Sequence, residues 1–286
     1  MSEKIENTGT IKDIWRYAVK SMGGENIESA KVIEGGILGD RGYALIDQSN
    51  GKIVSAKMPN LWGNLLELGA KFTKEPQENE ELPSVTIYWP DGTKISSDNR
   101  TLNKKLSERL GREVEITKNR PSEISLQRLD PLEKEETILD IGDIMMEGRF
   151  SDYAALHIVT TSSLNKLHEI DPDRSYNALR FRPNLIIDTS VNKNGFIENS
   201  WVDNVLCIGE EVRLKISDPT PRCAIPTLAQ KGGISKDPKI LRTIVEHNSQ
   251  PVPLLDDEVL PCVGVYAFVL QTGEIRNGDV IRIEKS

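Results

Sequence analysis

Residues 84–96 read Ser-Val-Thr-Ile-Tyr-Trp-Pro-Asp-Gly-Thr-Lys-Ile-Ser, and this stretch decides the fold class. Two runs rich in β-branched and aromatic residues, 84–89 and 93–96, flank the turn residues 90–92. Residues of these types suit a pleated, half-buried strand, and proline, aspartate and glycine together favour a tight turn. The stretch therefore predicts two strands joined by a turn, and hence a β-rich fold.

Similar short strands are expected on both sides of this stretch. The segment Thr10–Ser21 begins with residues suited to a strand and ends at two glycines, which permit a turn. A helix is expected from about Thr101 to Leu110, because leucines recur there every four residues and Gly111 can end it. Further strands are expected at 43–47, 53–56 and 113–117. Many short strands, glycine-rich turns and one helix predict a small β-barrel-like domain over residues 1–118.

The second half, residues 119–286, also favours strands over helices. Residues 119–149 mix charged with isolated apolar residues, so we interpret them as a connecting segment that can also serve as a lid over a site. The strands expected after it are 157–159, 185–188, two within 201–216, 262–270 and 279–283, and helices are expected to begin at 160–163 and 236–238. The sequence thus predicts a mainly β protein with some α-helix and two domains.

The composition argues against several classes of function. Of the 286 residues, 37% are hydrophobic and 28% are charged, which is typical of a soluble globular protein. The formal net charge is −8 and lysines and arginines do not cluster, so a nucleic-acid partner is not expected. The first residues are polar and no apolar run is long enough to span a bilayer. A cytoplasmic protein without a membrane partner is therefore expected.

One of the three cysteines lies in an unusual setting. Cys207, Cys223 and Cys262 form no CxxC pair, so neither a zinc ribbon nor a disulfide framework is expected. Cys223 lies in the segment 218–227, Asp-Pro-Thr-Pro-Arg-Cys-Ala-Ile-Pro-Thr, where three prolines predict a stiff loop and not the middle of a central strand. A thiol held beside Arg222 is a candidate thiolate, hence a nucleophile or a soft-metal ligand. The alternative is a small buried apolar residue, which is the interpretation we give to the other two cysteines.

Several polar motifs are candidate anion sites, each with a plain alternative. Lys20 and Ser21 lie at the end of an expected strand beside two glycines, where they can bind an oxyanion or simply face solvent. Arg41 follows an aspartate between glycines, so it either closes a turn with an ion pair or reaches a phosphate.

Two further motifs lie in the second half. Arg180 and Arg182 flank Phe181 at the entrance of a strand and can bind a phosphate or surface carboxylates. The hydroxyl residues Thr160–Ser163 open a helix, where they can bind an anion or only cap the helix.

Taken together, these motifs resemble those of MOSC proteins with an N-terminal MOSC β-barrel domain. That family includes the C-terminal region of molybdenum cofactor sulfurase and the amidoxime-reducing components. The motifs that carry the resemblance stand in the family's order: Tyr-Ala-Val-Lys-Ser at 17–21, Leu-Gly-Asp-Arg at 38–41, Phe-Ser-Asp at 150–152, Thr-Thr-Ser-Ser-Leu at 160–164, Arg-Phe-Arg-Pro-Asn at 180–184, Ile-Gly-Glu at 208–210, Pro-Arg-Cys at 221–223 and Ile-Arg-Asn-Gly-Asp at 275–279. The resemblance implies a MOSC β-barrel domain packed with the smaller N-terminal domain.

The resemblance also implies a cofactor, a molybdenum ion held by the dithiolene of a pterin. Cys223 matches the protein ligand of the metal, and Arg222 would favour its ionised form. Asp152 would lie near the metal and orient a water or relay a proton. The residues implied to hold the phosphate and pterin are Lys20, Ser21, Arg41 and Arg182, with hydrogen bonds added by Asn184, Thr160 and Thr161. The chain departs from the family pattern at Ala18 and at Pro221, where relatives often have a proline and a hydroxyl residue respectively.

Two functions follow from the resemblance. The favoured one is an oxidoreductase that reduces small N-hydroxylated or N-oxide compounds. Three scattered cysteines cannot build a plant-type iron–sulfur site, so its electrons are expected from a separate ferredoxin, flavodoxin or cytochrome. The alternative is a sulfur carrier or a cofactor-handling protein, in which Cys223 bears a persulfide or docks the cofactor and another protein is the sulfur donor.

Overall fold

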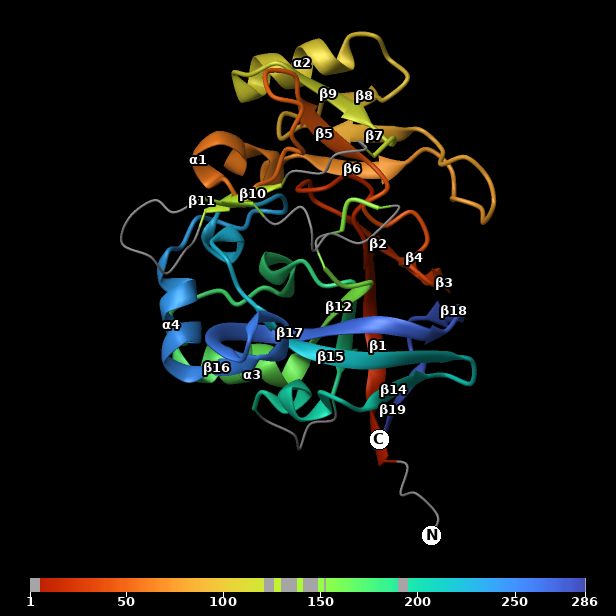
Figure 1. The fold of residues 1–286 in the computed structure, drawn as a ribbon, viewed down its shortest axis with the longest axis vertical. Helices are drawn as coiled ribbons and strands as arrows, with labels where there is room; N and C mark the ends of the chain where they lie inside the picture. Colours follow the sequence, from red (N-terminus) through yellow and green to blue (C-terminus); the bar gives the residue numbers. More distant parts are fainter. Residues whose placement is uncertain are drawn as a thin grey trace.

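The computed structural model describes residues 6–120, 126–129, 138–140, 149–151, 153–189 and 195–285. It is mainly β with some helices, as the sequence predicts (Figure 1). The expected hairpin is confirmed, because β7 (Val85–Tyr88) pairs antiparallel with β8 (Lys94–Ser96). The expected helix is confirmed as α2 (Leu102–Leu110), which ends at Gly111 in the left-handed conformation.

A closed barrel of seven strands is the main element of the fold. Its strands are β1 (Glu6–Arg16), β12 (Leu156–Thr160), β13 (Leu185–Asp188), β14 (Val205–Ile208), β15 (Val212–Pro221), β17 (Glu258–Gln271) and β19 (Val280–Glu284). They follow the order β12-β13-β1-β19-β14-β15-β17, and a pairing of β17 with β12 closes the ring. Closure leaves the ring without a free edge. Only β12 and β13 run parallel; the other neighbours in the ring are antiparallel.

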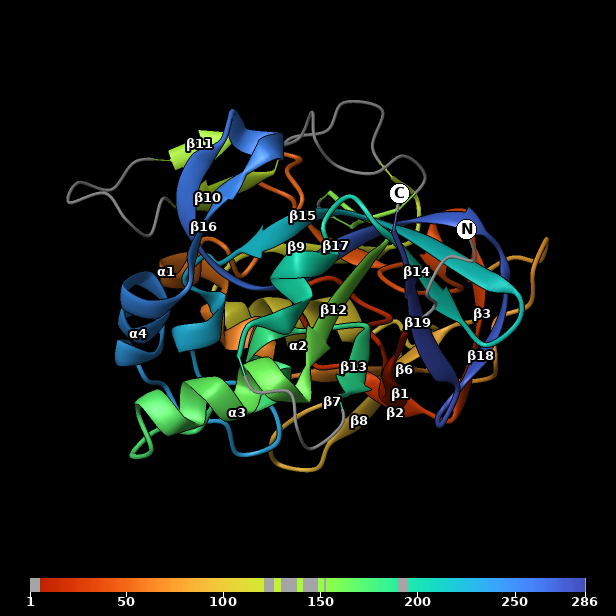
Figure 2. The same ribbon diagram turned by 90° about the horizontal axis from the view of Figure 1, so that it is seen from below.

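Further strands and the helices surround this ring. β2 (Glu25–Ile27) extends the sheet beside β1, and β16 (Ser249–Val252) extends it beside β17. The α-helices after residue 160 are α3 (Thr161–Ile170) and α4 (Lys239–His247), and the short 3₁₀ helices there are η3 (Ala178–Phe181), η4 (Ile197–Trp201), η5 (Ile225–Thr227) and η6 (Pro253–Leu255). Figure 2 shows α3 and α4 on the side of the barrel away from β14 and β19.

A second group of small sheets lies at one end of the barrel (Figure 1). Here β6 (Gly69–Phe72) joins β7 and β8, and β5 (Ala44–Asp47) pairs with β9 (Val114–Thr117). The remaining elements are β3 (Ser29–Ile33) and β4 (Gly36–Ile37) in one sheet with β18 (Gly273–Arg276), the pair β10 (Gln127–Leu129) and β11 (Ile138–Asp140), and α1 (Pro59–Trp62) followed by η1 (Gly63–Glu67).

A strand from the N-terminal half is part of the barrel, and its end determines where the site lies. β1 comes from the N-terminal segment but fills the gap between β13 and β19 in the barrel. Directly after it, Ala18, Val19 and Met22 are buried in a second apolar core, formed by the small sheets. Residues 17–22 therefore lie on the seam between two cores. The proposed division into domains 1–118 and 119–286 stays a prediction.

Two expected elements end differently in the structure. The first strand stops at Arg16 and does not continue to Ser21, because the backbone N–H of Tyr17 donates to the side chain of Asp40 at 2.8 Å instead of to a neighbouring strand. The segment expected to be a loop from Asp218 is still strand up to Pro221. Within the described residues, this end of β15 pairs only with β17, and the register of that pairing shifts twice near the prolines. An edge position and an irregular register are how a strand accommodates proline.

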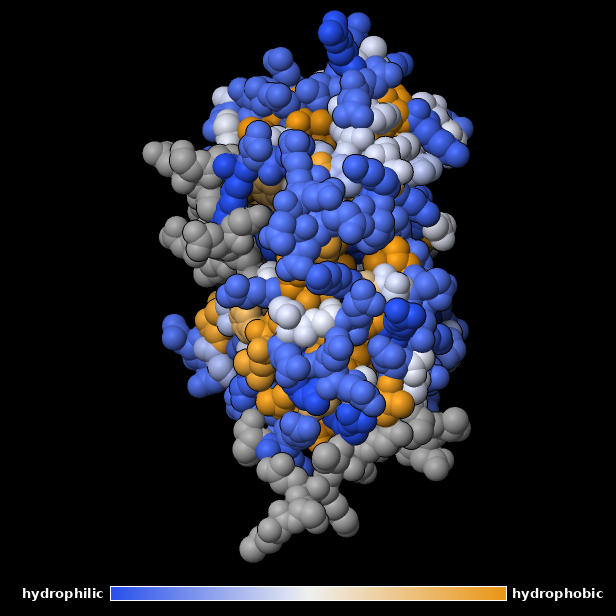
Figure 3. All heavy atoms as spheres, turned by 90° about the vertical axis from the view of Figure 1, so that its right-hand side faces the viewer, coloured by the Kyte–Doolittle hydropathy of each residue, from blue (hydrophilic) through white to orange (hydrophobic). Residues whose placement is uncertain are grey.

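The outer surface is mainly polar, as expected for a chain in which 28% of the residues are charged. The face drawn in Figure 3 is mainly hydrophilic, and its apolar residues form separate small patches. Within the described residues, no helix has both the length and the apolar character needed to cross a membrane. Cys207 and Cys262 are fully buried, as expected.

The closure of the barrel gives a test of the fold. Gly264 on β17 has φ +80°, and an added Cβ would collide with the carbonyl oxygen of Ile158 on β12. Gly264→Ala is expected to lower the free energy of unfolding by about 2–5 kcal/mol, from left-handed strain plus overpacking. The measurement is urea unfolding followed by circular dichroism.

Gly92→Ala is the matched control, because Gly92 has φ +87° but open space around it. It should cost only the conformational strain, about 1–2 kcal/mol. Equal losses in the two variants would show that the close approach of β17 to β12 does not limit this position.

Candidate functional site

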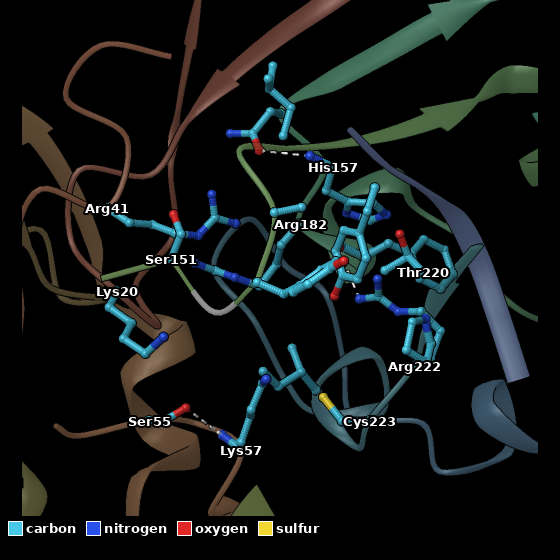
Figure 4. Close-up of a pocket in the computed structure, with 18 of the residues that line it drawn as sticks. Lys20, Arg41, Ser55, Lys57, Ser151, His157, Arg182, Thr220, Arg222 and Cys223 are labelled. Atoms are coloured by element: carbon cyan, nitrogen blue, oxygen red, sulfur yellow. Dashed lines mark hydrogen bonds between the residues drawn. The ribbon is translucent and has the colours of Figure 1, made fainter. Parts of the chain in front are cut away.

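A pocket opens on the seam between the barrel and the small sheets. Its described lining residues come from both parts: Lys20, Ser21, Arg41, Ser55, Lys57, Ser151, Tyr153, Ala154, Leu156, His157, Phe181, Arg182, Asn184, Thr220, Pro221, Arg222, Cys223, Ile225, Leu254, Leu255 and Tyr266. Figure 4 shows Lys20 and Arg41 on one side and Arg222 and Cys223 on the opposite side. The described lining contains five cationic side chains and no carboxylate. Such a pocket favours an anionic ligand.

Lys20 and Ser21 are both buried, so the surface alternative does not describe them. The Lys20 ammonium donates to the carbonyl of Phe150 at 2.9 Å. The Ser21 hydroxyl accepts the backbone N–H of Ala56 at 3.0 Å, and Ser21 itself has φ +64°. A non-glycine residue in this conformation is uncommon and is found often at ligand sites.

Two arginines stack on one tyrosine beside the pocket. The guanidinium carbons of Arg41 and Arg182 lie 4.9 and 4.3 Å from the ring centre of Tyr17. Burial raises the pKa of Tyr17 to about 12, although both arginines act in the opposite direction. The ring is therefore a neutral platform that holds two planar cations by cation–π contact.

The structure confirms the ion pair expected for Arg41, and phosphate binding by this residue stays a prediction. Its guanidinium forms an ion pair with the buried carboxylate of Asp40, as a turn would require, and it also lines the pocket. The carboxylate of Asp40 is 3.8 Å from Arg149 as well. Arg149 itself donates to the carbonyls of Ile37 and Asp40, at 2.9 and 2.7 Å, and burial lowers its pKa.

The two arginines around Phe181 have different roles. Arg180 is buried and donates to backbone carbonyls of Ser175 and Pro226, so it holds η3 and the loop after Cys223 in place. Arg182 adopts φ +56° after η3 and lines the pocket. On the two sides of this left-handed turn, the guanidinium of Arg180 bonds to backbone carbonyls and Arg182 lines the pocket.

Asn184 and His157 form the floor between β12 and β13. The Asn184 side chain accepts from the backbone N–H of His157 at 3.2 Å and donates to the carbonyl of Trp15 at 3.2 Å. A ring nitrogen of His157, Nε2, is 3.1 Å from the carbonyl of Val263. Burial, with a smaller effect of Arg222, lowers the pKa of His157 to about 3. The imidazole is therefore neutral at physiological pH.

Arg222 and Cys223 form the other wall. Arg222 donates to the carbonyl of Phe181 at 3.0 Å and lies 5.5 Å from the centre of its ring. Cys223 is a free, half-buried thiol that packs against the cluster of Ala56, Leu66 and Ile225. The loop after β15 thus presents the thiol to the same pocket as the cations.

Two hydroxyls in the lining lack partners. Ser151 is 3% and Thr220 is 1% exposed, and neither hydroxyl oxygen makes a hydrogen bond in the described part of the chain. A buried polar group without a partner costs free energy, so unpaired hydroxyls at a pocket wall fit a bound polar ligand.

Three of the expected site residues need separate comment. Thr160 and Thr161 do not line the pocket. Thr160 caps α3 by accepting the N–H of Ser163 and donates to buried Glu198 at 2.7 Å, while Thr161 donates to Asp188 at 3.1 Å. Capping therefore accounts for the hydroxyl of Thr160, and a contact with the end of β13 accounts for that of Thr161. Asp152 lies outside the described residues.

Other lining residues could not be assigned from the sequence. Ser151 and Thr220 lie in the segments 150–152 and 218–227, which the sequence marks as candidate sites. In these segments the residue types favour a functional role for Asp152 and Cys223 instead. Ser55, Lys57 and the leucines of η6 carry no local signal, because short loops lack periodicity.

The fold and site define a class of protein: a closed β-barrel with an associated small β domain and a pocket lined by cationic side chains and one thiol. The family models agree with this description. Residues 8–75 match the MOSC N-terminal beta barrel domain, and residues 146–282 match the MOSC domain. The chain therefore belongs to the MOSC proteins that carry this N-terminal domain, as its motifs predict.

Individual relatives are more distant. Mitochondrial amidoxime-reducing component 1 of Homo sapiens is 23% identical over 295 residues, covering 97% of this chain and 83% of the relative. Mitochondrial amidoxime reducing component 2 of Homo sapiens is 23% identical over 300 residues, covering 97% and 84%. Among solved structures, the YuaD protein from Bacillus subtilis covers 99% of both chains at 10% identity and a TM-score of 0.43. YiiM from Geobacillus stearothermophilus covers 56% of this chain and 73% of its own at 15% identity and a TM-score of 0.32.

The buried histidine predicts a pH dependence of stability. Because folding lowers the pKa of His157 from 6.5 to about 3, the unfolded chain binds its proton first as the pH falls. The contribution of His157 to the free energy of unfolding is fully present above pH 6.5. It is lost as the pH falls towards 3, by up to about 1.4 kcal/mol per pH unit. His157→Gln should flatten the dependence between pH 6.5 and 4, measured by urea unfolding at each pH. A variant that loses stability as steeply as the wild type would contradict this assignment.

Proposed function

We propose that this protein is a molybdenum cofactor-dependent oxidoreductase that reduces N-hydroxylated or N-oxide compounds with electrons from a separate redox protein. The observation that carries the proposal is the convergence of the Cys223 thiol with Lys20, Arg41 and Arg182 on one pocket. These residues lie far apart in the sequence. Two relatives whose names describe amidoxime reduction add support.

The residues present fit an anionic pterin cofactor. Cationic side chains and the buried hydroxyls of Ser151 and Thr220 suit its phosphate and polar edges. In this proposal Lys20, Ser21, Arg41 and Arg182 hold the phosphate and pterin, and Asn184 adds a hydrogen bond. Cys223 supplies the protein sulfur ligand, and Arg222 favours its ionised form. A thiolate is a suitable ligand for a soft metal centre.

When bound, the cofactor supplies two-electron oxygen-atom chemistry, for which the overall balance is R–NHOH + 2H⁺ + 2e⁻ → R–NH₂ + H₂O. The protein's own residues orient the substrate and handle protons. His157 stays neutral and keeps the floor uncharged. Asp152, by its place in the Phe-Ser-Asp motif, is proposed to relay a proton. The electrons come from a ferredoxin, flavodoxin or cytochrome partner.

The thiol gives the most direct test. Cys223→Ala is expected to lower the molybdenum content of protein from a cofactor-producing host by about tenfold or more, because a direct ligand is lost. Amidoxime reduction with an artificial electron donor should fall in parallel. The measurements are elemental analysis and product formation, with Cys207→Ala as a control because that cysteine is buried in β14.

Persulfide sulfur on Cys223 without molybdenum would support the alternative instead, a sulfur carrier or a cofactor-handling protein. A half-buried thiol in the pocket wall is compatible with that role. Full molybdenum loading without reduction of any N-hydroxylated compound would favour cofactor handling.

The cationic side predicts a separate effect on the pterin. Lys20→Met removes a buried ammonium and should weaken cofactor retention by about 2 kcal/mol, or about thirtyfold in affinity. The measurement is pterin content after gel filtration at increasing salt. Lys105→Met, on the exposed face of α2, is the matched control and should retain the wild-type pterin content.

A further inference from the structure

One wall of the pocket is apolar and comes from the short connection between β16 and β17. We call η6, Pro253–Leu255, the strap. Leu254 and Leu255 line the pocket and also pack against the buried cluster of Val252, Leu260 and Cys262. After the strap the chain reverses through Asp256 and Asp257, which have φ +53° and +62°. Aspartate tolerates this conformation better than most residues, so the reversal is built into the sequence.

The strap is tied to the strand that leads to Cys223. The carboxylate of Asp218 on β15 is 3% exposed. One of its oxygens accepts the backbone N–H of Leu254 at 2.9 Å, and the other lies 3.4 Å from the hydroxyl of Tyr153. Three parts of the pocket wall therefore meet at one buried carboxylate.

Aromatic rings continue the apolar surface. Tyr153 lies edge-on to Tyr266 and Phe268, with ring centres 5.5 and 5.3 Å apart. Tyr153 and Tyr266 line the pocket, as does Ile225 beside Cys223. Burial, with a smaller effect of Asp218, raises the pKa of Tyr153 to about 12, so its hydroxyl remains a neutral donor.

We propose that the strap is the substrate-selecting wall, and that it binds an aromatic or other apolar body of an N-hydroxylated substrate next to Cys223. This inference rests on the proposed function and names its substrate class. The cations suit the anionic cofactor, whereas the strap and the two tyrosines offer apolar and aromatic surface to a substrate body. Asp218 is a positioning residue, because it acts by holding Leu254 and Tyr153.

The test compares two amidoximes that differ in apolar body, benzamidoxime and acetamidoxime. Binding to the 286-residue chain, purified from a cofactor-producing host, is measured by isothermal titration calorimetry. The double variant L254S/L255S should weaken benzamidoxime binding by about tenfold or more and leave acetamidoxime binding within about twofold. Val259→Ser is the matched control, because Val259 follows the strap but is 63% exposed and lies outside the pocket lining.

The positioning role of Asp218 is tested by steady-state kinetics. Asp218→Asn should raise KM for benzamidoxime and leave kcat and molybdenum content unchanged, whereas Tyr153→Phe, which keeps the ring, should have a smaller effect. If the double variant does not fold, Leu255→Ala tests the same wall with less change.

Equal losses for both amidoximes, or the same loss in Val259→Ser, would overturn the strap proposal. Loss of molybdenum in L254S/L255S would also overturn it, because the strap would then hold the cofactor. Failure of the wild type to reduce either compound would contradict the proposed function, and calorimetry would still decide whether the strap selects an apolar body.

Discussion

The pocket depends on the interactions of one buried carboxylate, that of Asp40, with Tyr17 and Arg41. This carboxylate ends β1 by accepting the backbone N–H of Tyr17, and it balances the guanidinium of Arg41. A backbone bond from Arg41 to the carbonyl of Tyr17, at 2.6 Å, fixes the same two segments a second time. An unpaired charge at 1% exposure would be very costly, so the carboxylate and its cations must fold together.

The positions of the other site residues depend on these contacts of Asp40. With Tyr17 held in place, its ring supports Arg41 from one half and Arg182 from the other. Directly after Tyr17 the chain enters the second core with Ala18 and Val19, which fixes Lys20 and Ser21 on the seam. The site is thus assembled from turns at the ends of strands, while the strands themselves supply rigidity. Residues in unusual backbone conformations, Ser21, Arg41 and Arg182, are concentrated there.

The sequence predicts the parts of this arrangement that have local signals. The β7–β8 hairpin, α2 and the buried Cys207 follow from residue type and periodicity, and the family motifs lead to the barrel. The residue types around Phe181 do not distinguish Arg180 from Arg182. The family resemblance names Arg182, and the left-handed conformation of this residue after η3 accompanies its place in the pocket lining. The expected first strand is too long, because the side chain that ends it, Asp40, is distant in the sequence. The cofactor role expected for Thr160 and Thr161 finds no support in the pocket lining, because their hydroxyls bond within the cap of α3 and with Glu198 and Asp188.

The pairing of β1 has a consequence for how the chain folds as it is made. Glu6 lies opposite Ile283, and Ile14 lies opposite Leu185, so this early strand waits for partners that are synthesised much later. Contacts of such high sequence separation form slowly and leave an apolar strand edge exposed meanwhile. Because Lys20 and Ser21 follow that strand directly, a complete binding pocket exists only after the barrel has closed. If the proposed cofactor binds in this pocket, its loading would follow barrel closure, and its binding would stabilise the closed state by mass action.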